Sequence, residues 1–156
     1  MKKVHFIGIG GIGISAIARF LKERDFIISG SDIADSAITK ELRASGMKIT
    51  VPHCKTAIED PDFVVYSAAI KGDNVELLEA RKRGIECLSR KEALPFILEG
   101  KRVFAVAGAH GKSTTSAMLA ALMEGSAIIG AISKEFGSNM KYEASDNLIF
   151  EADESD

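Results

Sequence analysis

Short apolar runs alternate along the chain with stretches in which apolar residues recur at helical spacing. The runs hold a few consecutive apolar residues and lie close to glycine or polar residues, which is typical of buried strands. Between the first two runs, Ile14, Ile17, Ala18 and Leu21 fall at i, i+3, i+4 and i+7, one face of a helix. The pattern predicts strands at 4–7, 26–28, 49–51, 63–66, 102–107, 127–129 and 148–150.

Capping residues and glycines delimit the next helices. Ser36 can cap a helix that ends just before Gly46, and a helix over about 73–83 should end at Gly84. Gly30 is expected to close the second strand. Strands and helices that alternate in this way predict an α/β fold with a mainly parallel sheet.

Two later helices carry clear sequence signals. Ser89 and Glu92 have the spacing of a capping box, and Pro95 should leave the helix that follows short or kinked. The last helix should end at Gly125 and carries Thr115, Met118, Leu119 and Leu122 on one face.

The strand–glycine turn–helix pattern begins again after 99–101. We therefore predict two domains, 1–99 and 100–156. The second is small for an independent domain, so we interpret it as the start of a longer one. The chain as a whole is interpreted as a piece of a longer protein.

Composition excludes several classes of function. There are 20 Lys+Arg and 22 Asp+Glu, a net charge of −2, which argues against a general nucleic-acid binder. A hydrophobic share of 46% argues against disorder. No apolar stretch reaches the roughly 18 residues of a membrane span. Cys54 and Cys87 are far apart, which favours free thiols in the cytoplasm.

The first candidate site is the sequence Gly-Ile-Gly-Gly-Ile-Gly at 8–13. It matches G-x-G-x-x-G, follows a predicted strand and opens a helix, as in Rossmann-like nucleotide sites. Free N–H groups at Gly10, Gly11, Ile12 and Gly13 would face a nucleotide diphosphate. Asp32 would accept a ribose hydroxyl; the alternative is a turn-forming role in Gly-Ser-Asp.

A second glycine loop also joins a strand to a helix. Its sequence, Gly-Ala-His-Gly-Lys-Ser-Thr at 108–114, predicts ATP binding by a P-loop-type α/β ATPase domain. Val106 stands where a strict P-loop has its first glycine. Lys112 would reach the β- and γ-phosphates and Ser113 would coordinate Mg²⁺. The alternative is a glycine-rich turn with a solvated lysine. The predicted ATP-binding residues are Gly108, Ala109, His110, Gly111, Lys112, Ser113 and Thr114.

Three further residues are candidates because of their place in the predicted elements. Glu151 follows a strand, where an acid can hold the other side of the Mg²⁺ shell. The alternative is a solvated acidic tail, the favoured interpretation for the carboxylates at 153–156. Ser67 lies at the carboxyl end of a strand, where ligands of parallel sheets bind. Arg90 could contact substrate, although its position alone favours a surface role.

Five segments in one order together resemble the Mur ligases. They are VHFIGIGGIGISAIA, Gly-Ser-Asp at 30–32, Ser-Ala-Ala-Ile at 67–70, GAHGKSTT at 108–115 and EADESD at 151–156. That family has a UDP-substrate domain, a central ATPase domain and a C-terminal domain. The resemblance covers the first domain and the start of the second, so the rest of the central domain and the C-terminal domain would be missing partners.

The resemblance implies an ATP-dependent ligase of peptidoglycan precursor synthesis. Such an enzyme transfers a phosphoryl group from ATP to the carboxylate of UDP-N-acetylmuramate, and L-alanine then attacks the acyl phosphate. Lys112 would stabilise charge, and Ser113 and Glu151 would bind Mg²⁺. Gly10–Gly13 would face the UDP diphosphate. Ala109 departs from the threonine usual in this type of ligase.

Three alternatives remain open from the sequence. A ligase that recycles UDP-N-acetylmuramate tripeptides belongs to the same family. An NAD-dependent Rossmann oxidoreductase would explain 8–13 and Asp32 but not the second loop. A nucleotide-sensing module without catalysis is the third.

Overall fold

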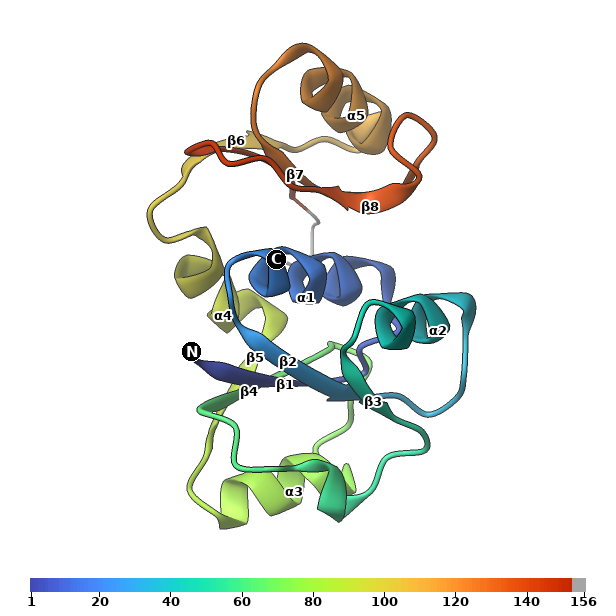
Figure 1. Cartoon of the computed structure of the whole chain (residues 1–156), viewed down its shortest axis with the longest axis vertical. Coiled ribbons are helices and arrows are strands. Elements are labelled where there is room, and N and C mark those ends of the chain that lie inside the picture. The colour runs from blue at the N-terminus through green and yellow to red at the C-terminus, as the bar shows by residue number, and fades with distance from the viewer. Residues whose placement is uncertain (153–156) are drawn as a thin grey trace.

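The computed structural model describes residues 1–152 and contains two sheets with helices between and around them (Figure 1). The first sheet is parallel throughout, in the order β3-β2-β1-β4-β5. Its strands are β1 Lys3–Ile7, β2 Ile27–Ser31, β3 Lys48–Thr50, β4 Phe63–Tyr66 and β5 Glu86–Ser89.

The second sheet has the order β6-β9-β7-β8. The β6–β9 and β9–β7 pairs are parallel, and β7 and β8 form an antiparallel hairpin. Its strands are β6 Arg102–Val106, β7 Ser126–Ser133, β8 Ser138–Lys141 and β9 Asn147–Glu151. The first strand of this sheet in the chain, β6, begins at Arg102.

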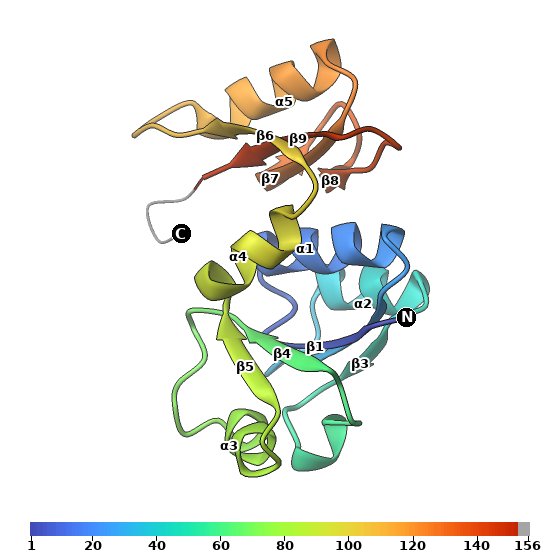
Figure 2. The same ribbon diagram turned by 90° about the vertical axis from the view of Figure 1, so that its left-hand side faces the viewer.

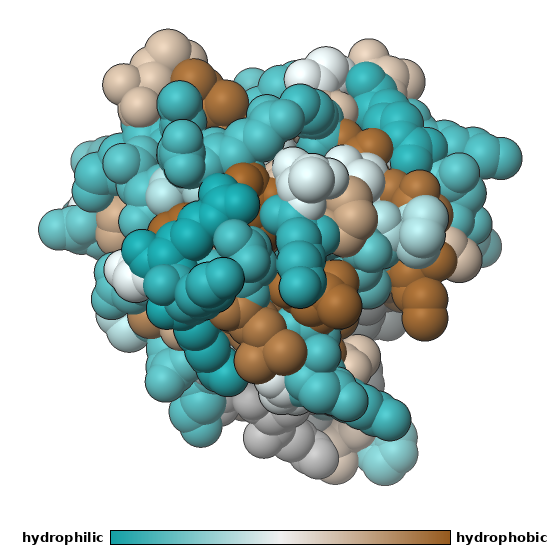
Figure 3. Space-filling view, turned by 90° about the horizontal axis from the view of Figure 1, so that it is seen from below, coloured by the Kyte–Doolittle hydropathy of each residue, from teal (hydrophilic) through white to brown (hydrophobic). Residues whose placement is uncertain are grey.

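Helices cover both faces of the first sheet. Figures 1 and 2 show α1, α2 and α4 on the face toward the second sheet and α3 on the opposite face. Beyond α3 the surface is mainly hydrophilic, with hydrophobic residues in small groups (Figure 3). The helices are α1 Ile12–Glu23, α2 Ala37–Ala44, α3 Val75–Lys82, α4 Arg90–Leu98 and α5 Lys112–Leu122, with a 3-10 turn η1 at Lys55–Ala57. Within residues 1–152 no helix is both long and apolar enough to cross a membrane.

Helix α1 packs against both sheets. Its buried residues share one core with Ile128, Leu148 and Phe150 of the second sheet. The side chain of Asn139 on β8 donates to the backbone oxygen of Ile12 at 2.6 Å and to the hydroxyl of Ser15 at 2.9 Å. The second sheet is therefore held on the first through α1.

The strand order places a crevice at the carboxyl ends of β1, β2 and β4. Strand order reverses between β1 and β4, and ligands of open parallel sheets bind outside such a reversal. The loop at 8–11 connects β1 to α1 at that edge. The topology therefore directs the first glycine loop into the crevice.

The parallel α/β prediction is confirmed, but two strands were not predicted. Strand β5 has only Cys87 and Leu88 as apolar residues and lies at the sheet edge, and β8 is mostly polar. Gly30 lies inside β2 rather than after it. An added Cβ there would lie 2.6 Å from Ile9 Cδ1 and 2.8 Å from the oxygen of Phe6, so the strand has no room for a side chain.

Two helix predictions also need correction. Helix α4 is short, as expected, but continues through Pro95 to Leu98. The apolar face of α5 expected from the spacing does not form its core contact, because Met118 is 60% and Leu122 82% exposed. Ser116 and Ala120 are buried instead, since small residues let α5 approach the sheet closely.

Candidate functional site

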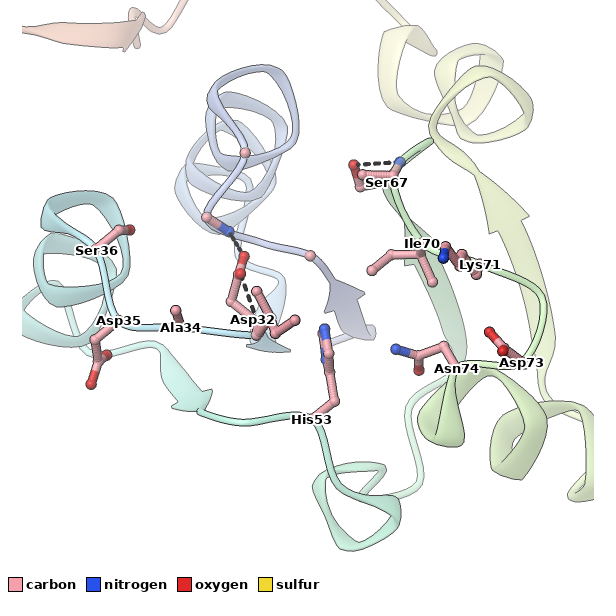
Figure 4. A pocket seen from close by; sticks show the side chains of 15 residues that line it. Asp32, Ala34, Asp35, Ser36, His53, Ser67, Ile70, Lys71, Asp73 and Asn74 are labelled. Atoms are coloured by element: carbon pink, nitrogen blue, oxygen red, sulfur yellow. Dashed lines mark hydrogen bonds between the residues drawn. The ribbon is translucent and has the colours of Figure 1, made fainter.

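A cavity of about 630 Å³ opens at the carboxyl ends of β1, β2 and β4 (Figure 4). The first glycine loop forms one wall through Gly8, Gly10 and Gly11. Asp32 and Ser67 also line it, as expected from their places after β2 and β4. This volume is in the range of small-molecule sites.

Asp32 holds the glycine loop in place. Its Oδ2 accepts the N–H of Gly10 at 2.7 Å, and its Oδ1 accepts the N–H of Ile33 at 2.7 Å. A Cβ on Gly10 would lie 2.7 Å from Oδ2. The glycine at position 10 is therefore required by the Asp32 carboxylate even without a ligand. A carboxylate has further lone pairs, so acceptance of a ribose hydroxyl stays a prediction.

Arg90 lies against the start of α1. A Cβ on Gly13 would be only 2.9 Å from Arg90 Nη1, so the guanidinium occupies the space that Gly13 leaves open. The capping box places Arg90 at the first position of α4, because Glu92 Oε2 accepts the N–H of Ser89 at 2.8 Å and Ser89 Oγ accepts that of Glu92 at 3.3 Å. Arg90 is therefore not a plain surface residue.

A second cavity, of about 390 Å³, lies between the N-termini of α1 and α4. Free N–H groups and the helix dipole make each helix N-terminus favourable for an anion, and two cationic side chains add to this. The structure thus brings together residues that the sequence predicted separately for the UDP-substrate. The lining includes Gly11, Ile12, Gly13, Ser67, Arg90 and Lys91.

The second glycine loop connects β6 to α5, as predicted. Gly108 and Gly111 have φ angles of +154° and +78°, a conformation that other residues rarely adopt. Lys112 Nζ donates to the backbone oxygen of Gly108 at 2.8 Å. The lysine therefore lies over its own loop. Ala109, His110 and Thr114 are exposed.

Ser113 and Glu151 come together from α5 and β9. The hydroxyl of Ser113 donates to Glu151 Oε1 at 2.9 Å, and Glu151 Oε2 accepts the N–H of Gly130 at 2.8 Å. Both predicted Mg²⁺ ligands offer oxygen atoms, which suit that ion. Across residues 1–152 no three His, Cys, Asp or Glu side chains form a metal-binding group. The other predicted acids, Asp153, Glu154 and Asp156, lie outside the described residues.

A third cavity, of about 360 Å³, joins the two glycine loops. Its lining comes from the starts of α1, α4 and α5 and from strands β7 and β9. The two predicted sites therefore face one shared space rather than two separate surfaces. The residues that line it are Ile12, Gly13, Arg90, Lys112, Gly130 and Glu151.

A buried acid that was not predicted from the sequence lies beside the 630 Å³ cavity. Glu76 on α3 is fully buried, as is His5 on β1, whose Nε2 lies 3.0 Å from Glu76 Oε2. Burial alone would raise the pKa of Glu76, but hydrogen bonds from His5, Ser31 and the N–H of Cys54 outweigh it and lower the pKa. A signal was present, because His5, Ser29 and Ser31 place polar groups in otherwise apolar strands.

Comparisons with known proteins agree on one family. The profile described as "Mur ligase family, catalytic domain" matches residues 3–102. UDP-N-acetylmuramate–L-alanine ligase of Campylobacter curvus is 75% identical over all 156 residues, which correspond to 36% of that protein. The chain therefore spans about a third of this relative.

Solved structures give the same result. The crystal structure of UDP-N-acetylmuramate-alanine ligase from Thermotoga maritima matches the whole chain and 38% of its own, with a TM-score of 0.93 and 34% identity. UDP-N-acetylmuramate:L-alanyl-gamma-D-glutamyl-meso-diaminopimelate ligase from Neisseria meningitides matches 99% of the chain and 53% of its own, with a TM-score of 0.88 and 27% identity. Because the family profile covers well over half of the residues, this chain belongs to the Mur ligase family.

Proposed function

We propose that the chain is part of an ATP-dependent ligase that joins L-alanine to the carboxylate of UDP-N-acetylmuramate in peptidoglycan precursor synthesis. The observation that carries this proposal is the third cavity, of about 360 Å³. Gly13 and Arg90, near the first glycine loop, line it together with Lys112 and Glu151, near the second. Phosphoryl transfer to a carboxylate requires both reactants in one geometry, and a shared cavity supplies the place.

In this proposal residues 1–99 bind the UDP-substrate. The diphosphate lies at the N-termini of α1 and α4, near Gly11 and Gly13, and the Arg90 guanidinium neutralises part of its charge. Ser67 lines both this cavity and the larger one, so it lies where diphosphate and nucleoside would meet. Asp32 fixes the loop and has lone pairs left for the ribose.

Residues 100–156 are, in the same proposal, the start of an ATP-binding domain. The Lys112 ammonium exchanges the backbone oxygen of Gly108 for phosphate oxygens and stabilises charge on the transferred group. Ser113 and Glu151 hold Mg²⁺, which would neutralise phosphate charge when bound. A Cβ on Gly130 would lie 3.0 Å from Glu151 Oε1, so the glycine leaves room for the carboxylate in this position.

The complete reaction needs more than this chain. A third of the ligase's length cannot enclose the amine, the carboxylate and the γ-phosphate together, so we expect this chain to bind UDP-N-acetylmuramate without ligation. The rest of the ligase would bring L-alanine. The tripeptide ligase is a second candidate, because the structure from Neisseria meningitides has the same arrangement at a TM-score of 0.88.

Calorimetric titration with UDP-N-acetylmuramate and with NAD tests the proposal, using Gly11→Ala as the informative variant. The backbone of Gly11 is extended, with φ −65°, and an added Cβ would make only ordinary contacts, 3.4 Å from Ile14 Cγ2. The fold should therefore tolerate the methyl group. A diphosphate bound close to the loop should collide with the methyl group, so the affinity for UDP-N-acetylmuramate should fall about tenfold or more.

Gly72→Ala is the matched control, because nothing lies within 4 Å of its added Cβ. It should bind the UDP-sugar as the wild type does. Tight binding of NAD without binding of the UDP-sugar would instead support the oxidoreductase. Equal affinity of Gly11→Ala and wild type would remove the glycine loop from the diphosphate site.

A further inference from the structure

Strand β8 of the second sheet lies beside α1 (Figures 1 and 2), and Asn139 on this strand contacts the first turn of the helix. The Asn139 side chain is buried, with 3% exposed. Its amide nitrogen donates to the backbone oxygen of Ile12 at 2.6 Å and to the hydroxyl of Ser15 at 2.9 Å. The Ser15 hydroxyl in turn donates to the same oxygen of Ile12 at 2.9 Å. A buried polar contact between the two sheets therefore ends on the first residue of α1.

The hydrogens available fix the orientation of the Asn139 amide. Ser15 has one hydroxyl hydrogen and donates it to Ile12, so the Ser15 oxygen must accept from Asn139, and a backbone oxygen can only accept. Both contacts therefore use the amide NH₂ group, and Oδ1 is left buried with no hydrogen-bond partner in the described part of the chain. A buried acceptor without a partner costs stability. Packing of the two sheets alone therefore explains an asparagine at this position poorly.

The contact supports a helix end that has no cap of its own. Among the helices of residues 1–152, side chains cap the first turns of α2, α3 and α4, whereas α1 and α5, which follow the two glycine loops, have no side-chain cap. A side-chain cap would occupy N–H groups that an anion needs, but a helix end without one frays more easily. Asn139 holds the first turn of α1 through a backbone oxygen, which leaves the N–H groups free.

We propose that Asn139 is a positioning residue for the diphosphate of the UDP-substrate. It acts through the Ile12 carbonyl and Ser15 and keeps the start of α1 in place beside the cavities of about 390 and 360 Å³, both of which Ile12 lines. Asn139 belongs to 100–156, so a site predicted within 1–99 is completed by the second sheet. This inference rests on the proposed function, in which the diphosphate binds at the N-termini of α1 and α4.

Asn139→Leu separates this role from packing. Leucine has the same branched arrangement of side-chain heavy atoms and lacks the unpartnered acceptor, and Ser15 keeps its hydrogen bond to Ile12. The free energy of unfolding should therefore change little. The substitution also removes the donor to the Ile12 oxygen, so the start of α1 should be less fixed and should bind a diphosphate more weakly.

Ser138→Ala is the matched control at the neighbouring position of β8. The Ser138 hydroxyl accepts from Arg19 Nη1 at 3.1 Å, so it also connects β8 to α1, but about two turns beyond Ile12. Arg19 keeps Glu41 as a partner at 2.8 Å when the hydroxyl is removed. The control therefore loses a contact between the same two elements and leaves the first turn of α1 untouched.

NMR titrations with UDP and with uridine would give both affinities for the wild type, Asn139→Leu and Ser138→Ala, and urea unfolding would give their stabilities. Because the nucleoside is common to both ligands, the ratio of the two affinities reports the contribution of the diphosphate. A general loosening of the chain lowers both affinities together and leaves the ratio unchanged. In Asn139→Leu the ratio should fall about fivefold, the size of effect expected for an anion at a helix N-terminus. Ser138→Ala should keep the wild-type ratio.

Each outcome decides the inference. An equal fall of the ratio in Ser138→Ala overturns it, because general docking of the two sheets would then be responsible. If Asn139→Leu does not fold, Asn139→Ala replaces it under the same criteria. A wild type that binds UDP no better than uridine overturns the diphosphate site and with it the proposed function. A wild type that prefers UDP, with the same preference in Asn139→Leu, overturns only the positioning role of Asn139.

Discussion

At the scale of single residues, two glycines of the first loop leave space for neighbouring side chains of the protein, whether or not a ligand is bound. Gly10 leaves room for the Asp32 carboxylate and Gly13 for the Arg90 guanidinium. Gly11 differs, because nothing in the fold forbids a side chain there. The glycines of this motif are therefore needed for different physical reasons. Of these three, only Gly11 allows a substitution that should affect ligand binding without disturbing the fold.

Glu76→Gln should destabilise the chain at neutral pH by about 2 kcal/mol, because an amide group would bring a donor toward Ser31 and His5, which donate to the carboxylate. The lowered pKa of Glu76 makes its contribution pH-dependent. The contribution is complete above the unfolded pKa, near 4.5, and is lost as pH falls through the lower folded value.

Urea unfolding of both proteins at neutral pH and at several values below about pH 4 would measure this. The difference in free energy of unfolding between wild type and variant should shrink in acid. A difference that is constant over this range would mean that Glu76 is not ionised in the folded state.

At the scale of elements, the capping box of α4 connects stability to the anion cavity. Ser89→Ala should lower the free energy of unfolding by about 1 kcal/mol through loss of the N-cap. It should also weaken UDP-N-acetylmuramate binding severalfold, because Arg90 follows the cap directly and depends on it for its position. Denaturant unfolding and calorimetry measure the two effects.

Ser89→Thr retains a capping hydroxyl and should restore both quantities. Recovery of stability without recovery of affinity would separate the cap from the placement of Arg90. Loss of stability with full affinity in Ser89→Ala would have the same meaning.

Helices with a clear apolar periodicity or a capping box could be predicted from the sequence. Strands that form mainly because a neighbouring strand pairs with them could not. The helix from Ile12 was visible in its apolar spacing, and α4 in its capping box. Strands β5 and β8 have few apolar residues and exist because neighbouring strands pair with them. For the site, both glycine loops were predictable from local sequence. The approach of Arg90 to Gly13 was not, since it depends on contacts 77 residues apart in the numbering.

At the scale of the whole molecule, the two sheets share a core through α1 and should unfold together. Ile128 and Phe150 pack in the same cluster as α1 residues, so neither sheet keeps a complete core when separated. Thermal unfolding followed by far-UV circular dichroism and by calorimetry should give one coincident transition.

Phe150→Ala should lower the midpoint of that single transition, because removal of a buried aromatic side chain costs about 3–5 kcal/mol. Two separated transitions, of which only one moves in Phe150→Ala, would show that the sheets are independent.

Helix α1 presents its first turn to the cavities and its side to β7 and β8. A ligand held at that first turn is thermodynamically linked to the order of the second sheet. Such linkage is reciprocal for binding free energies. If a nucleotide on the second glycine loop tightens the packing of α1, the UDP-sugar must raise the affinity for that nucleotide by the same factor. Under the proposed function, α1 would therefore couple the affinities of the UDP-sugar site and of the nucleotide site at the second glycine loop.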